Sequence, residues 1–89
     1  MVDVIFRDKL EEKIYLLYPY TEVSFREHIG DFEIVIKYFI YGEMRGFIET
    51  FSPELFNHDT EYRKYVFDVV INEFHRDIVE QTLRKRGRQ

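Results

Sequence analysis

The spacing of apolar residues near the N-terminus predicts a helix. Four of them recur three or four residues apart and share one helical face: Phe6, Leu10, Ile14 and Leu17. Asp3 is a suitable N-cap, and Pro19 ends the helix after Tyr18. An alternative interpretation makes residues 2–6 a short edge strand that precedes the helix.

Three segments of alternating apolar and polar residues follow, and they predict an antiparallel meander. The segments cover residues 21–28, 31–41 and about 45–51. Gly30 lies between the first two segments and Gly42 between the second and the third, where each suits a tight turn.

A two-residue turn of Ile29 and Gly30 sets the register of the first hairpin. It predicts these cross-strand pairs: Val23 with Ile36 and Phe25 with Ile34 on the inner face, and Glu22 with Lys37 and Arg26 with Glu33 on the outer face. The inner pairs are apolar and the outer pairs join opposite charges, so both faces support this register.

For the second hairpin we expect a three-residue loop over positions 42–44, which places Ile48 beside Tyr38 on the inner face. On the outer face it pairs Lys37 with Glu49 and Phe39 with Phe47. A two-residue loop would instead set Ile36 against Glu49, so packing favours the longer loop. The expected register gathers an apolar group on the outer face: Val35, Phe39, Phe47 and Phe51.

The last third of the chain predicts a short turn and then a long helix. Ser52 and Pro53 suit the N-cap and first position of the turn, and residues 57–60 offer caps for a helix of about 26 residues up to Gly87. Its main apolar stripe consists of Val66, Phe67, Val70, Ile71, Phe74 and Ile78. A second stripe, roughly opposite, consists of Tyr62, Tyr65, Val69, Val79 and Leu83. Such a helix spans ~39 Å, against a radius of gyration of ~12 Å, so we expect it to overhang its own core or to lie against something else.

These elements predict one α+β domain over residues 1–89, in the order αβββα, with a basic tail over residues 84–89 that we expect to fray. The order resembles that of double-stranded RNA-binding domains and of some small phage-encoded inhibitors, including certain anti-CRISPR proteins. The resemblance concerns the order alone. The last helix opens with Asp59-Thr60-Glu61-Tyr62, where the RNA-binding domains have a basic cluster.

Charge is divided unevenly along the chain, whose formal net charge is −4. Residues 1–80 hold all 17 acids and 9 of the 13 bases, a balance of −8. The last nine residues contain the remaining bases and no acid: Arg84, Lys85, Arg86 and Arg88. This basic tip could contact phosphate, although the acidic body would repel a nucleic-acid backbone elsewhere.

Residue types and spacings argue against catalysis and against a bound cofactor or metal. The chain has no Cys, no Gly-rich phosphate loop and no Ser in a nucleophile elbow. His28, His58 and His75 are not spaced as metal ligands. No apolar run approaches the ~20 residues of a membrane span, and the N-terminus does not resemble a signal peptide. We therefore expect a cytoplasmic location.

We predict a small non-enzymatic protein-binding module that binds a protein partner or forms a homodimer. Exposed apolar surface would supply the contact: Val35, Phe39, Phe47 and Phe51 on the sheet, and Tyr62, Tyr65 and Val69 on the long helix. The absence of Ala and the abundance of Ile, Phe, Tyr, Glu and Lys suggest the A/T-rich coding sequence of a phage, virus or plasmid. A fitting role is an accessory protein that binds or inhibits a host factor. The alternative function is nucleic-acid binding through the basic C-terminal residues.

Overall fold

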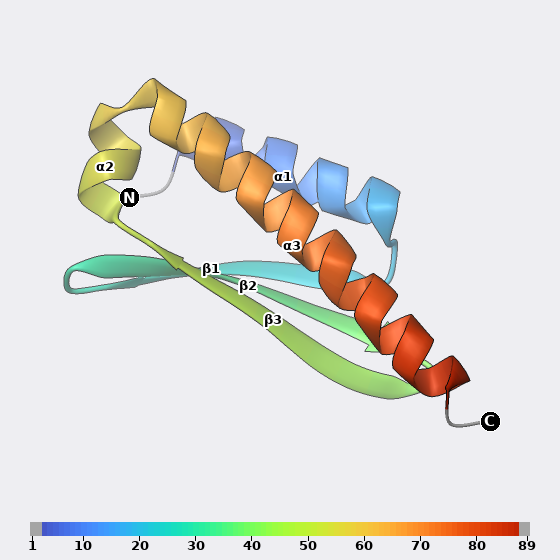
Figure 1. Ribbon diagram of the computed structural model, residues 1–89. Helices are drawn as coiled ribbons and strands as arrows, with labels where there is room; N and C mark the ends of the chain where they lie inside the picture. The colour runs from blue at the N-terminus through green and yellow to red at the C-terminus, as the bar shows by residue number, and fades with distance from the viewer. Residues whose placement is uncertain (1–2, 88–89) are drawn as a thin grey trace.

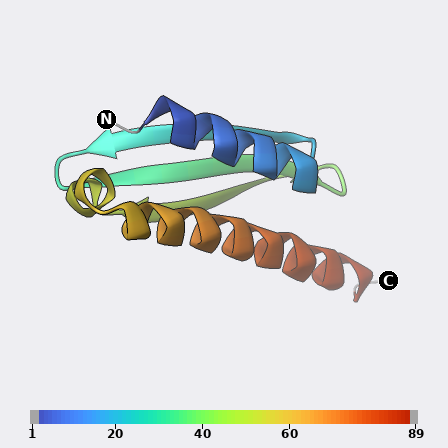
Figure 2. The same ribbon diagram turned by 90° about the horizontal axis from the view of Figure 1, so that it is seen from above.

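In the part of the chain that the structure describes, helices cover one face of the sheet and leave the other uncovered. The computed structural model describes residues 3–87. Its elements, in order, are α1 (Val4–Leu17), β1 (Thr21–His28), β2 (Asp31–Ile40), β3 (Glu43–Phe51), α2 (Pro53–His58) and α3 (Thr60–Arg86). The antiparallel sheet has the order β1-β2-β3, and α1 and α3 lie side by side on the same face of it (Figures 1 and 2). The predicted αβββα, α+β fold is thus confirmed.

Helix α1 begins where the sequence predicts. The Asp3 carboxylate accepts a hydrogen bond from the backbone N–H of Ile5 at 3.0 Å and so caps the helix. At the other end the Tyr18 N–H closes the last turn, and Pro19 follows. The alternative of an edge strand over residues 2–6 is wrong in the part that the structure describes, because residues 4–6 are helical.

The buried face of α1 is one residue shorter than the pattern predicts. Phe6, Leu10 and Ile14 are buried, as expected. Leu17 is 41% exposed, so its predicted place on the buried face is wrong. It is the last helical residue, where the chain already turns away towards β1.

The first hairpin has the predicted register along its whole length. All four predicted pairs occur: Val23 with Ile36, Phe25 with Ile34, Glu22 with Lys37 and Arg26 with Glu33. The turn consists of Ile29 and Gly30, and Gly30 has a φ of +88°, a conformation that glycine adopts at little cost.

The second hairpin has a different register from the one predicted. Its turn consists of Tyr41 and Gly42, with φ values of +50° and +78°. Positive φ at both positions is typical of a type I′ turn, whose twist matches that of the strands it joins. Ile40 therefore pairs with Glu43, and the whole of β3 is displaced by three residues from the expected pairing.

This displacement reverses the face on which each β3 side chain lies, because successive strand residues point to opposite faces. Phe47 and Phe51 lie on the helix-covered face, so their predicted place on the outer face is wrong. Phe51 is buried, and the ring of Phe47 lies 5.8 Å from that of Phe74, between centroids. Ile48, predicted to be inside, is 56% exposed on the other face.

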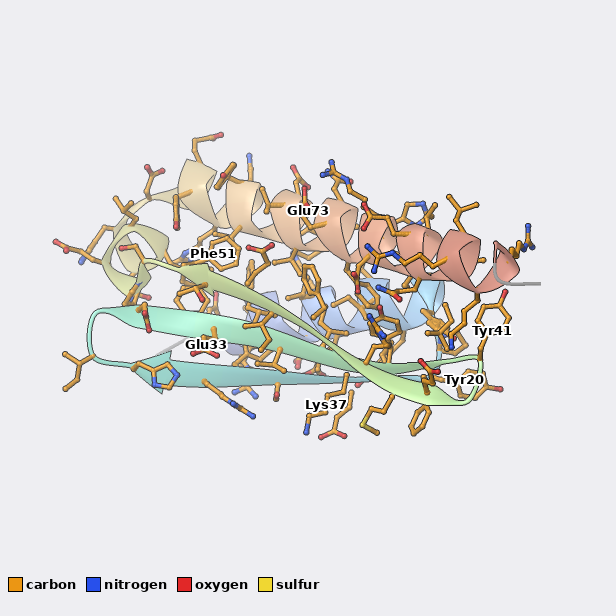
Figure 3. All side chains as sticks on the ribbon, turned by 60° about the horizontal axis from the view of Figure 1, so that its bottom comes forward. Tyr20, Glu33, Lys37, Tyr41, Phe51 and Glu73 are labelled. Carbon is orange, nitrogen blue, oxygen red and sulfur yellow. The ribbon has the colours of Figure 1, made fainter. Side chains whose placement is uncertain are left out.

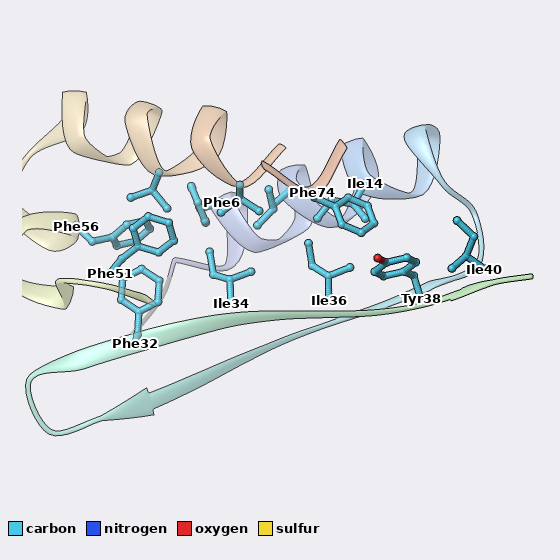
Figure 4. Close-up of a cluster of buried hydrophobic side chains, with 13 residues drawn as sticks. Phe6, Ile14, Phe32, Ile34, Ile36, Tyr38, Ile40, Phe51, Phe56 and Phe74 are labelled. Atoms are coloured by element: carbon cyan, nitrogen blue, oxygen red, sulfur yellow. The ribbon is translucent and has the colours of Figure 1, made fainter. Parts of the chain in front are cut away.

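The core fills the space between the sheet and the helices (Figure 4). It is built mainly from these buried residues: Phe6, Leu10 and Ile14 of α1, Phe32, Ile34, Ile36, Tyr38 and Ile40 of β2, and Val66, Val70 and Phe74 of α3. Phe56 of α2 closes one end, with its ring edge-on to Phe6 at 4.8 Å and to Phe32 at 5.2 Å. Aromatic pairs in this geometry add stabilisation beyond the burial of their area.

Helix α3 follows a capped short helix, as predicted. The Asp59 carboxylate accepts from the N–H groups of Glu61 and Tyr62 at 2.9 and 3.2 Å. The helix has 27 residues, in a molecule with extents of 48 × 24 × 19 Å. It reaches as far as the β2–β3 turn, where Lys85 contacts Glu43 at 2.5 Å (Figure 1). The expectation that the helix overhangs its own core or lies against something else is therefore wrong at this end, because the β2–β3 hairpin of the same chain extends as far as the helix does.

Candidate protein-binding surface

The face of the sheet turned away from the helices carries no other element among residues 3–87, and we call it the open face (Figure 3). The observed registers place these side chains on it: Glu22, Ser24, Arg26 and His28 of β1, Asp31, Glu33, Val35, Lys37 and Phe39 of β2, and Met44, Gly46, Ile48 and Thr50 of β3. They form rows that cross the three strands, and each row has its own chemistry.

One end of the open face is apolar. Tyr20, Phe39 and Met44 are 74%, 49% and 57% exposed, and we call them the apolar corner. Together with Pro19, Thr21, Glu22 and Lys37 they line a shallow cavity of about 290 Å³. Aromatic side chains and methionine are enriched at protein interfaces, where they supply area and adaptability.

Two charged rows lie further along the open face. Glu22 stands opposite Lys37, and Arg26 stands opposite Glu33. Glu33 also contacts the Nε2 atom of His28 at 2.9 Å. Each of the two rows thus carries one acid and one base.

A central row separates the two charged rows. It consists of Ser24, Val35 and Ile48, which stand opposite one another on the three strands. Val35 is only 3% exposed although none of the described helices covers it, whereas Ile48 projects and is 56% exposed. The middle of the open face is therefore small or apolar, between flanking rows of opposite charges.

Gly46 leaves a gap in the row of Lys37. Its φ is not positive, the pairing of β3 passes through it without a bulge, and a Cβ atom placed there would meet nothing within 4 Å. Neither the backbone nor packing within the chain therefore requires glycine. Glycine inside a strand also occurs where another backbone or a ligand approaches closely.

The seven predicted contact residues do not form one surface. Val35 and Phe39 lie on the open face, whereas Phe47 and Phe51 face the helices. On α3, the Tyr62 hydroxyl accepts from the Ser52 N–H at 3.3 Å, Val69 packs against the core, and Tyr65 is 57% exposed.

Sequence reasoning missed three exposed apolar residues of the open face: Tyr20, Met44 and Ile48. Recognition of Tyr41-Gly42 as a two-residue turn would have placed Met44 and Ile48 there, because the register follows from the turn.

The helix-covered face carries a small polar cluster where α3 crosses the sheet. The hydroxyl of Tyr38, whose ring is buried, donates to the Asp77 carboxylate. Burial and then Asp77 raise the Tyr38 pKa well above its usual range. Burial, and then the negative charge of Glu73, also raise the pKa of Glu49. The Tyr38–Asp77 hydrogen bond thus links α3 to β2, whereas the charges of Glu49 and Glu73 repel each other across α3 and β3.

The basic residues near the C-terminus are divided between the fold and solvent. Arg84 and Arg86 are exposed in the last turn of α3, whereas Lys85 contacts Glu43. Arg88, the fourth predicted nucleic-acid contact, lies outside the described residues.

No group of three His, Asp or Glu side chains within residues 3–87 is arranged so that it could hold a metal ion. In the same part of the chain, none of the helices has an apolar stretch long enough to cross a membrane.

Comparison with protein-family models, with curated proteins and with solved structures found no match for this chain. Function is therefore inferred from its surfaces.

Proposed function

We propose that this chain is a non-enzymatic protein-binding module that uses the open face of its sheet. The observation that supports the proposal is the apolar corner, three exposed side chains beside rows of paired charges on a sheet face that no element of residues 3–87 covers. Contiguous exposed apolar surface with a polar border is typical of interaction sites, because leaving it in water costs free energy.

The charges of the open face favour a protein over a nucleic acid. The face carries the carboxylates of Glu22, Asp31 and Glu33 against the cations of Arg26 and Lys37. A phosphate backbone would require a clear excess of cations, whereas a protein surface can match charges of both signs. A module of this kind could serve as the phage, viral or mobile-element accessory protein that we predict, which would act by occupying a partner's surface.

Substitution of Phe39 tests the proposal. Phe39→Asp puts a charge in the apolar corner, and because Phe39 is half exposed, the fold should be retained. The matched control is Tyr65→Asp, an equally exposed aromatic on α3. We expect the first variant to lose at least tenfold in partner capture or self-association, and the control to keep both, as measured by quantitative affinity purification and sedimentation velocity. The opposite result would move the interface to α3.

Phe47→Asp is unsuitable as a probe of binding. Phe47 packs against Phe74 beneath the helices, so a charge there would disturb the core and not an exposed surface.

Nucleic-acid binding through Arg84 and Arg86 is a second proposal, supported by the exposure of both side chains in the last turn of α3. A mobility shift of short RNA or DNA duplexes at low salt, abolished by removal of residues 84–89 and by added salt, would favour it.

A further inference from the structure

We infer that the partner on the open face is a second copy of this chain. The two sheets would pack face to face about a two-fold axis that lies between them and crosses the strands at right angles, along the central row of Ser24, Val35 and Ile48. This inference rests on the proposed function, since it names the occupant of the same surface.

The charged rows are arranged symmetrically about this axis. Glu22 and Arg26 lie two residues on either side of Ser24, and Lys37 and Glu33 lie two residues on either side of Val35. Rotation about the axis keeps each strand over its own equivalent and exchanges the two rows. Glu22 then faces Arg26 of the second copy, and Lys37 faces Glu33 of the second copy. Every charge in both rows meets an opposite charge, which offsets the repulsion between two chains of net charge −4.

The central row and the Gly46 gap fit the same arrangement. Residues on the axis meet their own equivalents, which suits the small Ser24 and the apolar Val35 and Ile48, because like charges there would repel. Gly46 comes opposite Thr50 of the second copy. The missing side chain lets the two β3 strands approach closely, which accounts for a glycine that the single chain does not require.

The axis also brings two exposed apolar features together. Ile29, at the tip of the first hairpin, is fully exposed. At ~3.4 Å per residue it lies ~17 Å from Ser24 along β1, and Tyr20 lies ~14 Å from Ser24 in the opposite direction. The hairpin tip of each copy thus reaches the apolar corner of the other, where the axis sets Phe39 opposite Asp31 and Tyr20 opposite His28 of the second copy. The twist of the sheets displaces these outer rows from direct superposition, and Ile29 is the apolar residue that the tip supplies.

The size of the open face limits the affinity. Three strands ~4.8 Å apart and about eight residues long present a face of ~14 by ~27 Å. This is smaller than the ~800 Å² that each partner buries in a standard interface. We therefore expect a dissociation constant in the micromolar range, measurable by sedimentation velocity.

Exchange of charges tests the axis directly. The double variant Glu22→Lys/Lys37→Glu reverses one row, and Arg26→Glu/Glu33→Arg reverses the other. Each double variant keeps opposite charges across the strands of its own chain and keeps the net charge. The second also removes the contact between His28 and Glu33, so the first is the better matched of the two. Between two identical variant copies, however, every pair across the interface becomes repulsive.

The expected result is that wild type dimerises, that each double variant alone associates at least tenfold more weakly, and that an equimolar mixture of the two regains the dimer. The mixture regains it because the reversed row of one variant faces the reversed row of the other. A merely structural effect of the substitutions would not be rescued by mixing.

Two outcomes would overturn the inference. If wild type dimerises but the mixture does not, the two-fold axis is wrong. If wild type is monomeric at concentrations of several hundred micromolar, pairing of two copies is wrong, and capture of a different partner through Phe39 still tests the proposed function separately.

Circular dichroism should confirm that each double variant is folded. If one is not, Ser24→Lys replaces it, because a cation on the axis would face its own equivalent and should likewise disperse the dimer. A dimer that persists in Ser24→Lys would contradict the axis.

Discussion

Glu49 lies on the helix-covered face of β3, beside Glu73 of α3. Burial and then the charge of Glu73 raise the Glu49 pKa in the folded chain. A carboxyl with a raised folded-state pKa contributes to stability in its protonated form and loses that contribution as pH rises through the folded pKa. Ionisation of Glu49 therefore costs the folded chain stability.

Glu49→Gln should stabilise the protein at pH 7, because the amide has no charge to bury or to repel Glu73. The advantage over wild type should shrink as pH falls and Glu49 becomes protonated. Urea denaturation at pH 7.5 and pH 4.5 measures both effects, with the exposed Glu12→Gln as control. An advantage for Glu49→Gln that is equal at the two pH values would exclude this explanation.

At the scale of elements, the β2–β3 turn decides which surface the protein offers. Tyr41 has a φ of +50°, a backbone conformation that residues with a Cβ atom adopt at a cost in free energy. Asn adopts this conformation at a smaller cost than Tyr does. Because Tyr41 is 57% exposed, its replacement removes little buried area.

Tyr41→Asn is therefore expected to stabilise the protein by about 0.5–1 kcal/mol, and Gly42→Ala, at a φ of +78°, to destabilise it by about 1 kcal/mol. Thermal unfolding of the two variants measures the difference. A destabilised Tyr41→Asn variant would show that the tyrosine ring contributes more than the backbone conformation costs.

The two hairpins also show why sequence predicted one register and not the other. In the first hairpin, apolar pairs on one face and opposite charges on the other agree on a single alignment. In β3, Phe47 and Ile48 are adjacent and both apolar, so either face can be read as the inner one. The alignment depended on a tyrosine in a left-handed conformation, which sequence preferences do not favour.

The candidate surface was less predictable than the fold for the same reason. Helix caps, the buried stripe of α3 and the order of elements follow from local patterns, and these were confirmed. Which side chains share the open face depends on the pairing of β2 with β3. Because the loop between these strands was predicted wrongly, Phe47 and Phe51 were expected on the open face, where Met44 and Ile48 lie instead.

At the scale of the whole molecule, the first and last helices complete one core. Phe6, Leu10 and Ile14 of α1 belong to the same buried cluster as Val66, Val70 and Phe74 of α3. A chain cut after residue 59 loses α3 and with it the buried residues that α3 contributes to this cluster. We expect such a chain to show no cooperative thermal transition and poor dispersion of its NMR signals. A chain cut after Gly87 should unfold as wild type does. Cooperative unfolding of the shorter chain would contradict this view of the core.

The packing of α1 beside α3 also has a consequence for synthesis. The apolar stripe of α1 is translated before the sheet, and α3, which completes its cover, is translated after the sheet. The nascent chain therefore exposes the apolar surface of α1 until α3 has been translated, and during that interval chaperones would be its main protection against aggregation.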